Sequence, residues 1–353
     1  MADAQQTKHA PAHLARAAVL GAGAWGTALA VTLANRRTEA PEPQVNEPQV
    51  KLWAHESSTV AAINTQHENK EFLPGLSLPE TIVATTALAD LADSDIVLMV
   101  VPAQFARRVI ADIAPLLKPD ASLVLCAKGV ERDSLKFMSD VASDYIDEGQ
   151  IAVLSGPSFA ADVARGLPTA VTLACTDPTR GAYLCEQIGS AGFRPYLSGD
   201  VIGAEIGGAL KNVLAIACGI VAGKQLGESA RAAITARGFV EMQRLGTALG
   251  AKPETLGGLS GLGDLILTCS SDTSRNFSLG RALGEGASAA QVLAQRSSVS
   301  EGAMSAQAVI ALAVRHDLEL PICAAVDAVL SGALETDAAI QTLMARPFTA
   351  EVD

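Results

Sequence analysis

The chain has 353 residues, a length that favours two domains over one. It is 49% hydrophobic and 18% charged, so a large core can form and wholesale disorder is excluded. The formal net charge of −12 repels phosphate backbones, which makes nucleic acid a poor partner. A small phosphorylated substrate still fits, provided that a local basic cluster overrides the overall charge.

A glycine-rich turn near the N-terminus is the first informative feature. Residues 1–16 are polar and are expected to form a disordered tail. Residues 17–35, AAVLGAGAWGTALAVTLAN, run from an apolar stretch through G-x-G-x-x-G into a helix-like segment, as dinucleotide-binding proteins do. In this reading Gly21 permits the tight turn, Gly23 lets the backbone approach a pyrophosphate, and Gly26 lets helix and strand pack closely.

The same stretch has two other readings, because nineteen uncharged residues near the N-terminus could form a membrane span or a signal peptide. Its glycines and alanines make a poor membrane span, and no long basic segment precedes it. We therefore predict dinucleotide binding, and no integral membrane segment.

Apolar runs in the first half of the chain predict the strands of a doubly wound, mostly parallel sheet. A stretch at 38–49, rich in proline and glutamate, is expected to be a loop insertion. The runs after it alternate with helical patterns, and polar groups directly follow three of them, as at the ligand-binding edge of such sheets. The expected strands after the insertion are 50–53, 81–84, 96–101, 121–127, 151–154, 170–175 and 193–197.

From about Asp200 the hydrophobic period becomes helical, and no strand run of comparable strength follows. We therefore predict an α/β, Rossmann-like domain at 17–199 and an all-α domain at 200–345, with a short tail at 346–353. The six cysteines and five histidines show no metal-binding spacing, so no metal site is expected and the thiols should be reduced, as in a cytoplasmic protein.

Lys211 stands out because it lies in the otherwise apolar segment GALKNVLAIACGI, with no acidic residue four positions away. It could be a lysine whose stem is buried and whose amine reaches solvent. Alternatively, burial could lower the pKa of the amine, which would let it act as a general base. The pattern leaves both readings open.

A second group of candidates could hold a phosphorylated substrate. Asp264 and Thr268 lie four residues apart and would share one face of a helix. Ser274-Arg275-Asn276 is expected in a polar loop after them, where an arginine fork beside hydroxyl and amide groups suits phosphate. Lys128 and the stretch 156–158 each follow an expected strand, which brings them to the same edge of the sheet.

Together these residues resemble one family, the bacterial type of NAD(P)-dependent glycerol-3-phosphate dehydrogenase. The resemblance covers nearly the whole chain, and its motifs stand in the family's order. They are GAGAWGTALA, LWAH, HENKEFLPG, VPAQ, AKGVE, SGPSFA, GGALKNVLAIACGI, GLGDLILTC, SRNFSLG, VSEG and the terminal LMARP.

The resemblance implies a cytoplasmic enzyme that interconverts sn-glycerol 3-phosphate and dihydroxyacetone phosphate with NAD or NADP and supplies phospholipid synthesis. Lys211 would accept the proton of the C2 hydroxyl, with Lys128 and Asp264 as its catalytic neighbours. The substrate-binding set comprises Lys128, Gly156, Ser158, Lys211, Asp264, Thr268, Ser274, Arg275 and Asn276. The cofactor-binding set comprises Gly21, Gly23, Ala24, Trp25, Gly26, His55, Lys128, Ala160, Arg275, Val299 and Glu301. No metal is implied, and a homodimer is expected.

Four departures from the family's pattern bear on the cofactor and the substrate. The insertion at 38–49 lengthens the turn before the second strand, and Ala24 replaces a usual serine. Glu56 stands where many relatives carry arginine, and a carboxylate there would repel a 2′-phosphate, which favours NAD over NADP. Phe277-Ser278 stands where relatives often have further basic residues.

Two alternative functions remain open at this point. One is a 3-hydroxyacid-type dehydrogenase of the same superfamily, which Ser274-Arg275-Asn276 disfavours because those residues suit phosphate. The other is a nucleotide-binding sensor without catalysis, which the presence of Lys211, Lys128 and Asp264 disfavours.

Overall fold

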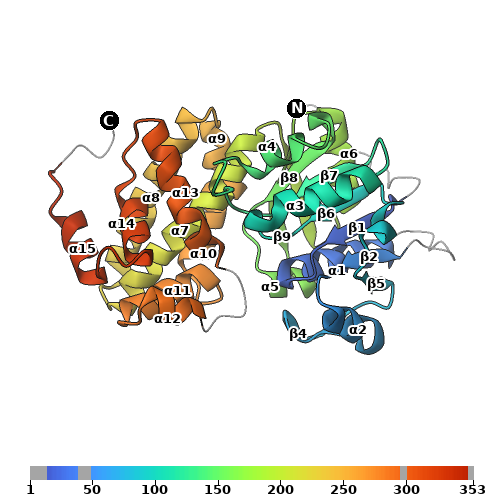
Figure 1. Cartoon of the computed structure of the whole chain (residues 1–353), viewed down its shortest axis with the longest axis horizontal. Helices are drawn as coiled ribbons and strands as arrows, with labels where there is room; N and C mark the ends of the chain where they lie inside the picture. Colours follow the sequence, from blue (N-terminus) through green and yellow to red (C-terminus); the bar gives the residue numbers. More distant parts are fainter. Residues whose placement is uncertain (1–13, 39–48, 295–299, 349–353) are drawn as a thin grey trace, which may run out of the picture.

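The computed structural model describes residues 14–38, 49–294 and 300–348. Most of the expected N-terminal tail, nearly all of the expected insertion and the last five residues therefore lie outside the described residues. Figure 1 shows two parts side by side, an α/β part that contains the sheet and a part built from helices. The predicted fold class is confirmed.

The first part is an eight-stranded sheet in the order β10-β9-β8-β7-β6-β1-β2-β5. All neighbouring strands are parallel except β8 and β9. Each predicted run coincides with a strand: β1 (Ala17–Leu20), β2 (Val50–Trp53), β5 (Ile82–Thr85), β6 (Ile96–Met99), β7 (Ser122–Leu125), β8 (Ile151–Ser155), β9 (Thr169–Cys175) and β10 (Phe193–Ser198).

Helices cover both faces of this sheet, which explains why its central strands are apolar without alternation. On β1, for example, Val19 belongs to the core on one face and Leu20 to the core on the other. The helices of this part are α1 (Ala24–Thr38), α2 (Ser57–Gln66), α3 (Ala103–Ile113), α4 (Met138–Ser143), α5 (Ala160–Ala164) and α6 (Pro178–Ile188).

The second part contains no strand among the described residues after Ser198, as the helical period predicts. A π-helical turn at Leu259–Gly263 precedes α10 directly. The helices are α7 (Val201–Gly223), α8 (Glu228–Ala248), α9 (Pro253–Leu256), α10 (Asp264–Cys269), α11 (Arg275–Gly284), α12 (Ala289–Ala294), α13 (Glu301–Arg315), α14 (Pro321–Leu330) and α15 (Thr336–Met344).

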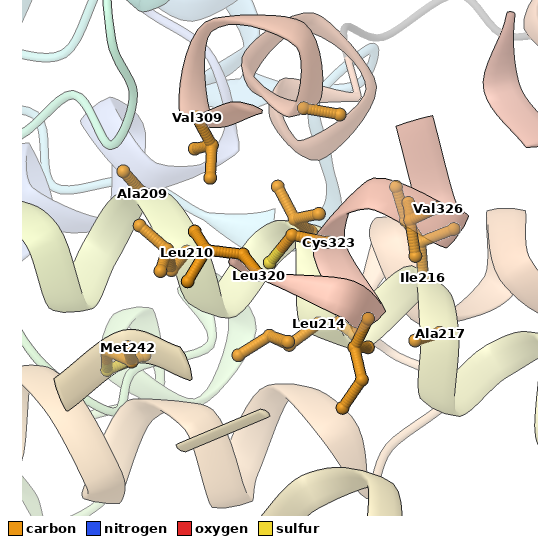
Figure 2. Packing of buried hydrophobic residues seen from close by; sticks show 14 of the residues in the cluster. Ala209, Leu210, Leu214, Ile216, Ala217, Met242, Val309, Leu320, Cys323 and Val326 are labelled. Atoms are coloured by element: carbon orange, nitrogen blue, oxygen red, sulfur yellow. The ribbon is translucent and has the colours of Figure 1, made fainter. Parts of the chain in front are cut away.

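Helix α7 forms the centre of the helical part. Figure 2 shows its residues Leu210, Leu214 and Ile216 among apolar side chains that include Val309 and Cys323, which belong to α13 and α14. Among the described residues it is the one helix long and apolar enough to cross a membrane, but 89% of its apolar window is buried inside the protein. Its composition is therefore that of a core helix.

Helices α7 and α11 lie so close together that their backbones touch at two glycines. A Cβ atom added to Gly219 of α7 would lie 2.1 Å from the carbonyl oxygen of Phe277, and one on Gly280 of α11 would lie 2.0 Å from that of Ile216. Real Cβ atoms do not approach so closely, so each glycine is required for this contact. The contact fixes the start of α11 relative to α7.

A buried carboxylate connects α7 to the sheet domain. Glu205 accepts hydrogen bonds from the backbone N–H of Ser139, at 2.9 Å, and from its hydroxyl, at the start of α4. Burial raises the pKa of Glu205 to about 7, and these hydrogen bonds oppose that rise. The interaction holds the first turns of α7 against the α/β part.

Candidate active site

The candidate site lies where the carboxyl ends of neighbouring parallel strands meet the helical part. The glycine-rich turn follows β1, His55 follows β2, Lys128 follows β7, and Gly156 follows β8. A hollow at the same edge is lined by Pro102 and the residues after it, and by residues at the start of α13. This is the edge at which open α/β sheets bind ligands.

A lysine–aspartate–lysine cluster spans the two parts. Asp264, which is fully buried, accepts from Nζ of Lys211 at 2.5 Å through Oδ1 and from Nζ of Lys128 at 2.7 Å through Oδ2. Lys128 also donates to the carbonyl of Gly156 at 3.2 Å, and Lys211 donates to the hydroxyl of Thr268 at 3.1 Å. Three segments that are distant in the sequence thus supply one charged centre.

The surroundings of Lys211 are those of a buried amine. The residue is 7% exposed, so its amine does not reach bulk solvent as a snorkelling lysine would. Burial lowers the pKa of Lys211 to about 8, with the charge of Lys128 acting in the same direction and that of Asp264 opposing it. An amine with this pKa can gain and lose a proton near neutral pH.

Two glycines of α7 let the cluster assemble. A Cβ atom on Gly207 would lie 2.2 Å from the carbonyl oxygen of Ser260, in the turn just before Asp264. One on Gly208 would lie 3.1 Å from Cγ of Lys128. Because these two glycines carry no side chain, the segment at Ser260 and the side chain of Lys128 can pack directly against α7. They do so one helical turn before Lys211.

Ser274-Arg275-Asn276 does not form a loop, so that prediction is wrong. Ser274 is the N-cap of α11 and its hydroxyl accepts from the backbone N–H of Phe277 at 3.2 Å, which lets the helix begin at Arg275. Ser274 and Asn276 are buried, whereas Arg275 is exposed at the positive end of the helix. The helix dipole and the guanidinium therefore both place positive charge at this position.

A chain of amide hydrogen bonds, absent from the sequence analysis, joins the helices that carry the candidate residues. Asn212 donates to the carbonyl of Gly208 at 3.2 Å and accepts from Nδ2 of Asn276 at 2.9 Å. Asn276 in turn accepts from the backbone N–H of Gly302 at 3.2 Å. The signal in the sequence was the second polar residue of the apolar segment, Asn212, directly after Lys211.

The glycine-rich turn has the shape that a dinucleotide needs. Gly21 has a φ of +122°, and a Cβ atom on Gly26 would lie 1.8 Å from the carbonyl oxygen of Gly21. Around Gly23 no atom lies within 4 Å of such a Cβ atom, so the backbone faces open space at the start of α1. The buried Nε1 of Trp25 has no hydrogen-bond partner among the described residues. These features fit a bound pyrophosphate and its neighbouring groups.

Other candidates of the cofactor-binding set lie on segments outside this turn. His55 and Glu56 are exposed beyond β2, and Ala160 begins α5, which packs against α1. Burial raises the pKa of Glu301, and the charges of Arg275, Lys128 and Lys211 oppose the rise. Val299 lies outside the described residues.

Within the described residues, no group of three or more acidic, cysteine or histidine side chains could hold a metal ion. All six cysteines are free thiols.

The chain matches two family models that together span most of its length. Residues 16–180 match the N-terminal part of NAD-dependent glycerol-3-phosphate dehydrogenase, and residues 200–341 match its C-terminal part.

Curated relatives and solved structures agree with these matches. The chain is 55% identical over 334 residues to glycerol-3-phosphate dehydrogenase [NAD(P)+] of Parvibaculum lavamentivorans, covering 95% of this chain and 97% of the relative. It is 55% identical over 333 residues to the enzyme of the same name from Caulobacter vibrioides, with coverages of 94% and 98%. The crystal structure of glycerol-3-phosphate dehydrogenase from Coxiella burnetii superposes with a TM-score of 0.87 at 38% identity, covering 94% of this chain and 99% of that one. This chain therefore belongs to the family of NAD(P)-dependent glycerol-3-phosphate dehydrogenases.

Proposed function

We propose that the protein interconverts sn-glycerol 3-phosphate and dihydroxyacetone phosphate with NAD(H) or NADP(H). The observation that carries this proposal is the Lys211–Asp264–Lys128 cluster, which lies at the sheet edge that also presents the glycine-rich turn. Membership of the family supports the same activity.

Lys211 is the proton acceptor in this proposal. In the oxidation, its neutral amine takes the proton of the substrate's C2 hydroxyl while the C2 hydride leaves, and the carbonyl of the ketone forms. In the reduction, its ammonium returns the proton to the C2 oxygen. Bound NAD(P) supplies the hydride acceptor and NAD(P)H the hydride donor. Asp264 holds Lys211 and Lys128 in place through its two oxygens, which orients the amine toward the substrate.

The substrate's phosphate binds at the start of α11 in this proposal. Arg275 contributes a fork of donors, and the helix terminus contributes a positive partial charge. Ser158 after β8 lies at the same edge of the sheet and completes the substrate-binding set with Gly156, Thr268, Ser274 and Asn276.

Enzyme assays test the proposal directly. The absorbance of NADH and NADPH should fall in the presence of dihydroxyacetone phosphate and change little with dihydroxyacetone, which lacks the phosphate. Equal turnover of a non-phosphorylated 2- or 3-oxoacid would instead support the 3-hydroxyacid-type reading. Binding of NADH without turnover of any of these compounds would support a sensor.

Replacing Arg275 with alanine should raise the KM for dihydroxyacetone phosphate by roughly 10- to 100-fold, since a hydrogen bond to a charged group contributes about 1.5–3 kcal/mol. Steady-state kinetics measure this change. Arg281→Ala is the matched control, because Arg281 lies on the same helix but pairs with Asp272 at 2.9 Å. An unchanged KM in Arg275→Ala would remove the clamp from the proposal.

The exposed carboxylate of Glu56, directly after β2, should make the enzyme prefer NADH to NADPH, because it would repel the 2′-phosphate. Glu56→Arg should raise kcat/KM for NADPH by about tenfold, the effect of about 1.4 kcal/mol of new charge interaction. Glu80→Arg, a charge reversal at another exposed site, controls for the change in net charge. A wild-type preference for NADPH would contradict the prediction.

The proposal extends to the cellular setting of the protein. We propose a cytoplasmic homodimer that provides glycerol 3-phosphate for phospholipid synthesis. Sedimentation of the purified protein tests the dimer, and a cytoplasmic location is tested by fractionating cells that express the chain.

A further inference from the structure

Asn69 is a buried polar residue that neither the substrate-binding nor the cofactor-binding set includes. It lies at the end of β3 (Glu68–Asn69), which pairs with β4 (Leu73–Ser77) in a two-stranded sheet outside the main one. The sequence analysis missed this small sheet, because β3 has two residues and β4 contains a proline and a glycine. Asn69 is 1% exposed.

The side chain of Asn69 reaches the glycine-rich turn, 47 residues earlier in the chain. Its Nδ2 donates to the carbonyl oxygen of Ala22 and to the hydroxyl of Thr27, both at 2.8 Å. Its Oδ1 accepts from the backbone N–H of Phe72 at 3.2 Å. Since a carbonyl oxygen can only accept and a backbone N–H can only donate, these partners fix the orientation of the amide.

The hydroxyl of Thr27 forms hydrogen bonds with both Ala22 and Asn69. It donates to the same carbonyl of Ala22 at 3.3 Å while it accepts from Asn69. The carbonyl of Ala22 thus receives two hydrogen bonds from buried side chains, one from the start of α1 and one from outside the strand–turn–helix unit.

The position of this carbonyl determines where the next N–H group points. A trans peptide is planar, with its C=O and N–H on opposite sides, so a carbonyl of Ala22 directed toward Asn69 directs the N–H of Gly23 away from it. At Gly23 no atom lies within 4 Å of where a Cβ atom would stand, so a ligand can approach the backbone there. An N–H directed away from Asn69 at the start of α1 is suited to donate to a phosphate oxygen.

We propose that Asn69 is a positioning residue for dinucleotide binding, which holds the Ala22–Gly23 peptide in the orientation that binds the pyrophosphate. This inference rests on the proposed use of the glycine-rich turn for the cofactor. It assigns the two-stranded sheet a role, which is to carry a side chain that sets the shape of the turn without touching substrate.

The test separates binding of the dinucleotide from catalysis and stability. In Asn69→Ala, the Kd for NADH, measured from the fluorescence of the bound cofactor, should rise by about tenfold, as expected when a buried acceptor loses its donor. The KM for dihydroxyacetone phosphate at saturating NADH and the kcat should stay near wild-type values. Thr27→Val, which keeps the shape of the side chain, should raise the Kd in the same direction by a smaller factor.

Asn64→Ala is the matched control. Asn64, on α2, also exchanges two hydrogen bonds with backbone, donating to the carbonyl of Ala84 at 2.9 Å and accepting from its N–H at 2.8 Å. It does not contact the turn through these bonds, so its replacement should leave the Kd for NADH unchanged.

The possible outcomes are distinct. If both Asn69→Ala and Thr27→Val bind NADH as the wild type does, and only the melting temperature falls, Asn69 is a structural anchor and the inference is overturned. That result leaves the proposed function intact as long as the wild type reduces dihydroxyacetone phosphate. A wild-type protein that binds neither NADH nor NADPH overturns both. If Asn69→Ala does not fold, the Kd of Thr27→Val decides.

Discussion

Replacing Lys211 with alanine is expected to lower kcat by about 10²- to 10⁴-fold, the usual contribution of a positioned general acid or base. The amine has a lowered pKa and lies in the charged cluster, where it donates hydrogen bonds to Asp264 and Thr268. NADH should still bind, because the glycine-rich turn belongs to the other part of the molecule. Stopped-flow and steady-state assays in both directions measure the loss.

Two further variants make this test specific. Lys211→Met keeps most of the volume of the side chain and removes the amine, so it should lose as much activity as Lys211→Ala without leaving a cavity. Lys224→Ala removes a lysine at the end of the same helix, one that pairs with the exposed Asp337, and should retain activity. Turnover by Lys211→Met near the wild-type rate would show that another group accepts the proton.

The wild-type enzyme should show the same group in its pH dependence. With the pKa of Lys211 at about 8, the amine is protonated below that pH and neutral above it. Oxidation of glycerol 3-phosphate requires the neutral base, so its rate should rise as the pH passes through about 8. Reduction requires the ammonium, so its rate should fall over the same interval.

The second large effect is expected when Asp264 is replaced with asparagine. This change leaves two ammonium groups, those of Lys211 and Lys128, close together without their shared carboxylate. Removing one partner of a buried ion pair costs about 3–5 kcal/mol, because the remaining charge stays buried and unpaired. We therefore expect the free energy of unfolding, measured in urea, to fall by about that amount.

Asp264→Asn should also move the pH dependence. Because the charge of Asp264 raises the pKa of Lys211, its loss should lower that pKa and shift the oxidation profile to lower pH. Asp337→Asn is the control for stability: its partner is Lys224 and its side chain is 72% exposed, so the loss should stay below about 1 kcal/mol. Equal losses in the two variants would mean that the buried cluster adds no more stability than the exposed pair does.

The sheet could be predicted from the sequence because each of its strands is a local pattern. A strand buried on both faces is a short apolar run, and the residue after it reaches the binding edge whatever the rest of the chain does. Lys128 and Gly156 were placed at one edge on this argument, and the structure brings them into hydrogen-bonding contact. The same holds for Asp264 and Thr268, which share a helix face as their spacing requires.

Other features depend on contacts between distant segments, which a local pattern does not contain. Lys211 has no acidic residue nearby in its own helix, and its partner Asp264 is 53 positions away. Asn69 lies 47 positions from the carbonyl it holds. Ser274-Arg275-Asn276 reads as a loop because serine and asparagine favour turns, but the same serine can cap a helix, and packing against α7 decides the outcome.

The glycine contacts between α7 and α11 bear on how the enzyme could measure the length of its substrate. Side chains at a helix interface can change rotamer and let the helices slide, whereas Cα atoms and carbonyl oxygens in direct contact have no such freedom. The contact therefore fixes how far apart the backbones of α7, which carries Lys211, and α11, which carries Arg275, lie. In the proposed mechanism this fixed separation should disfavour a compound whose phosphate lies one carbon further from the reacting hydroxyl.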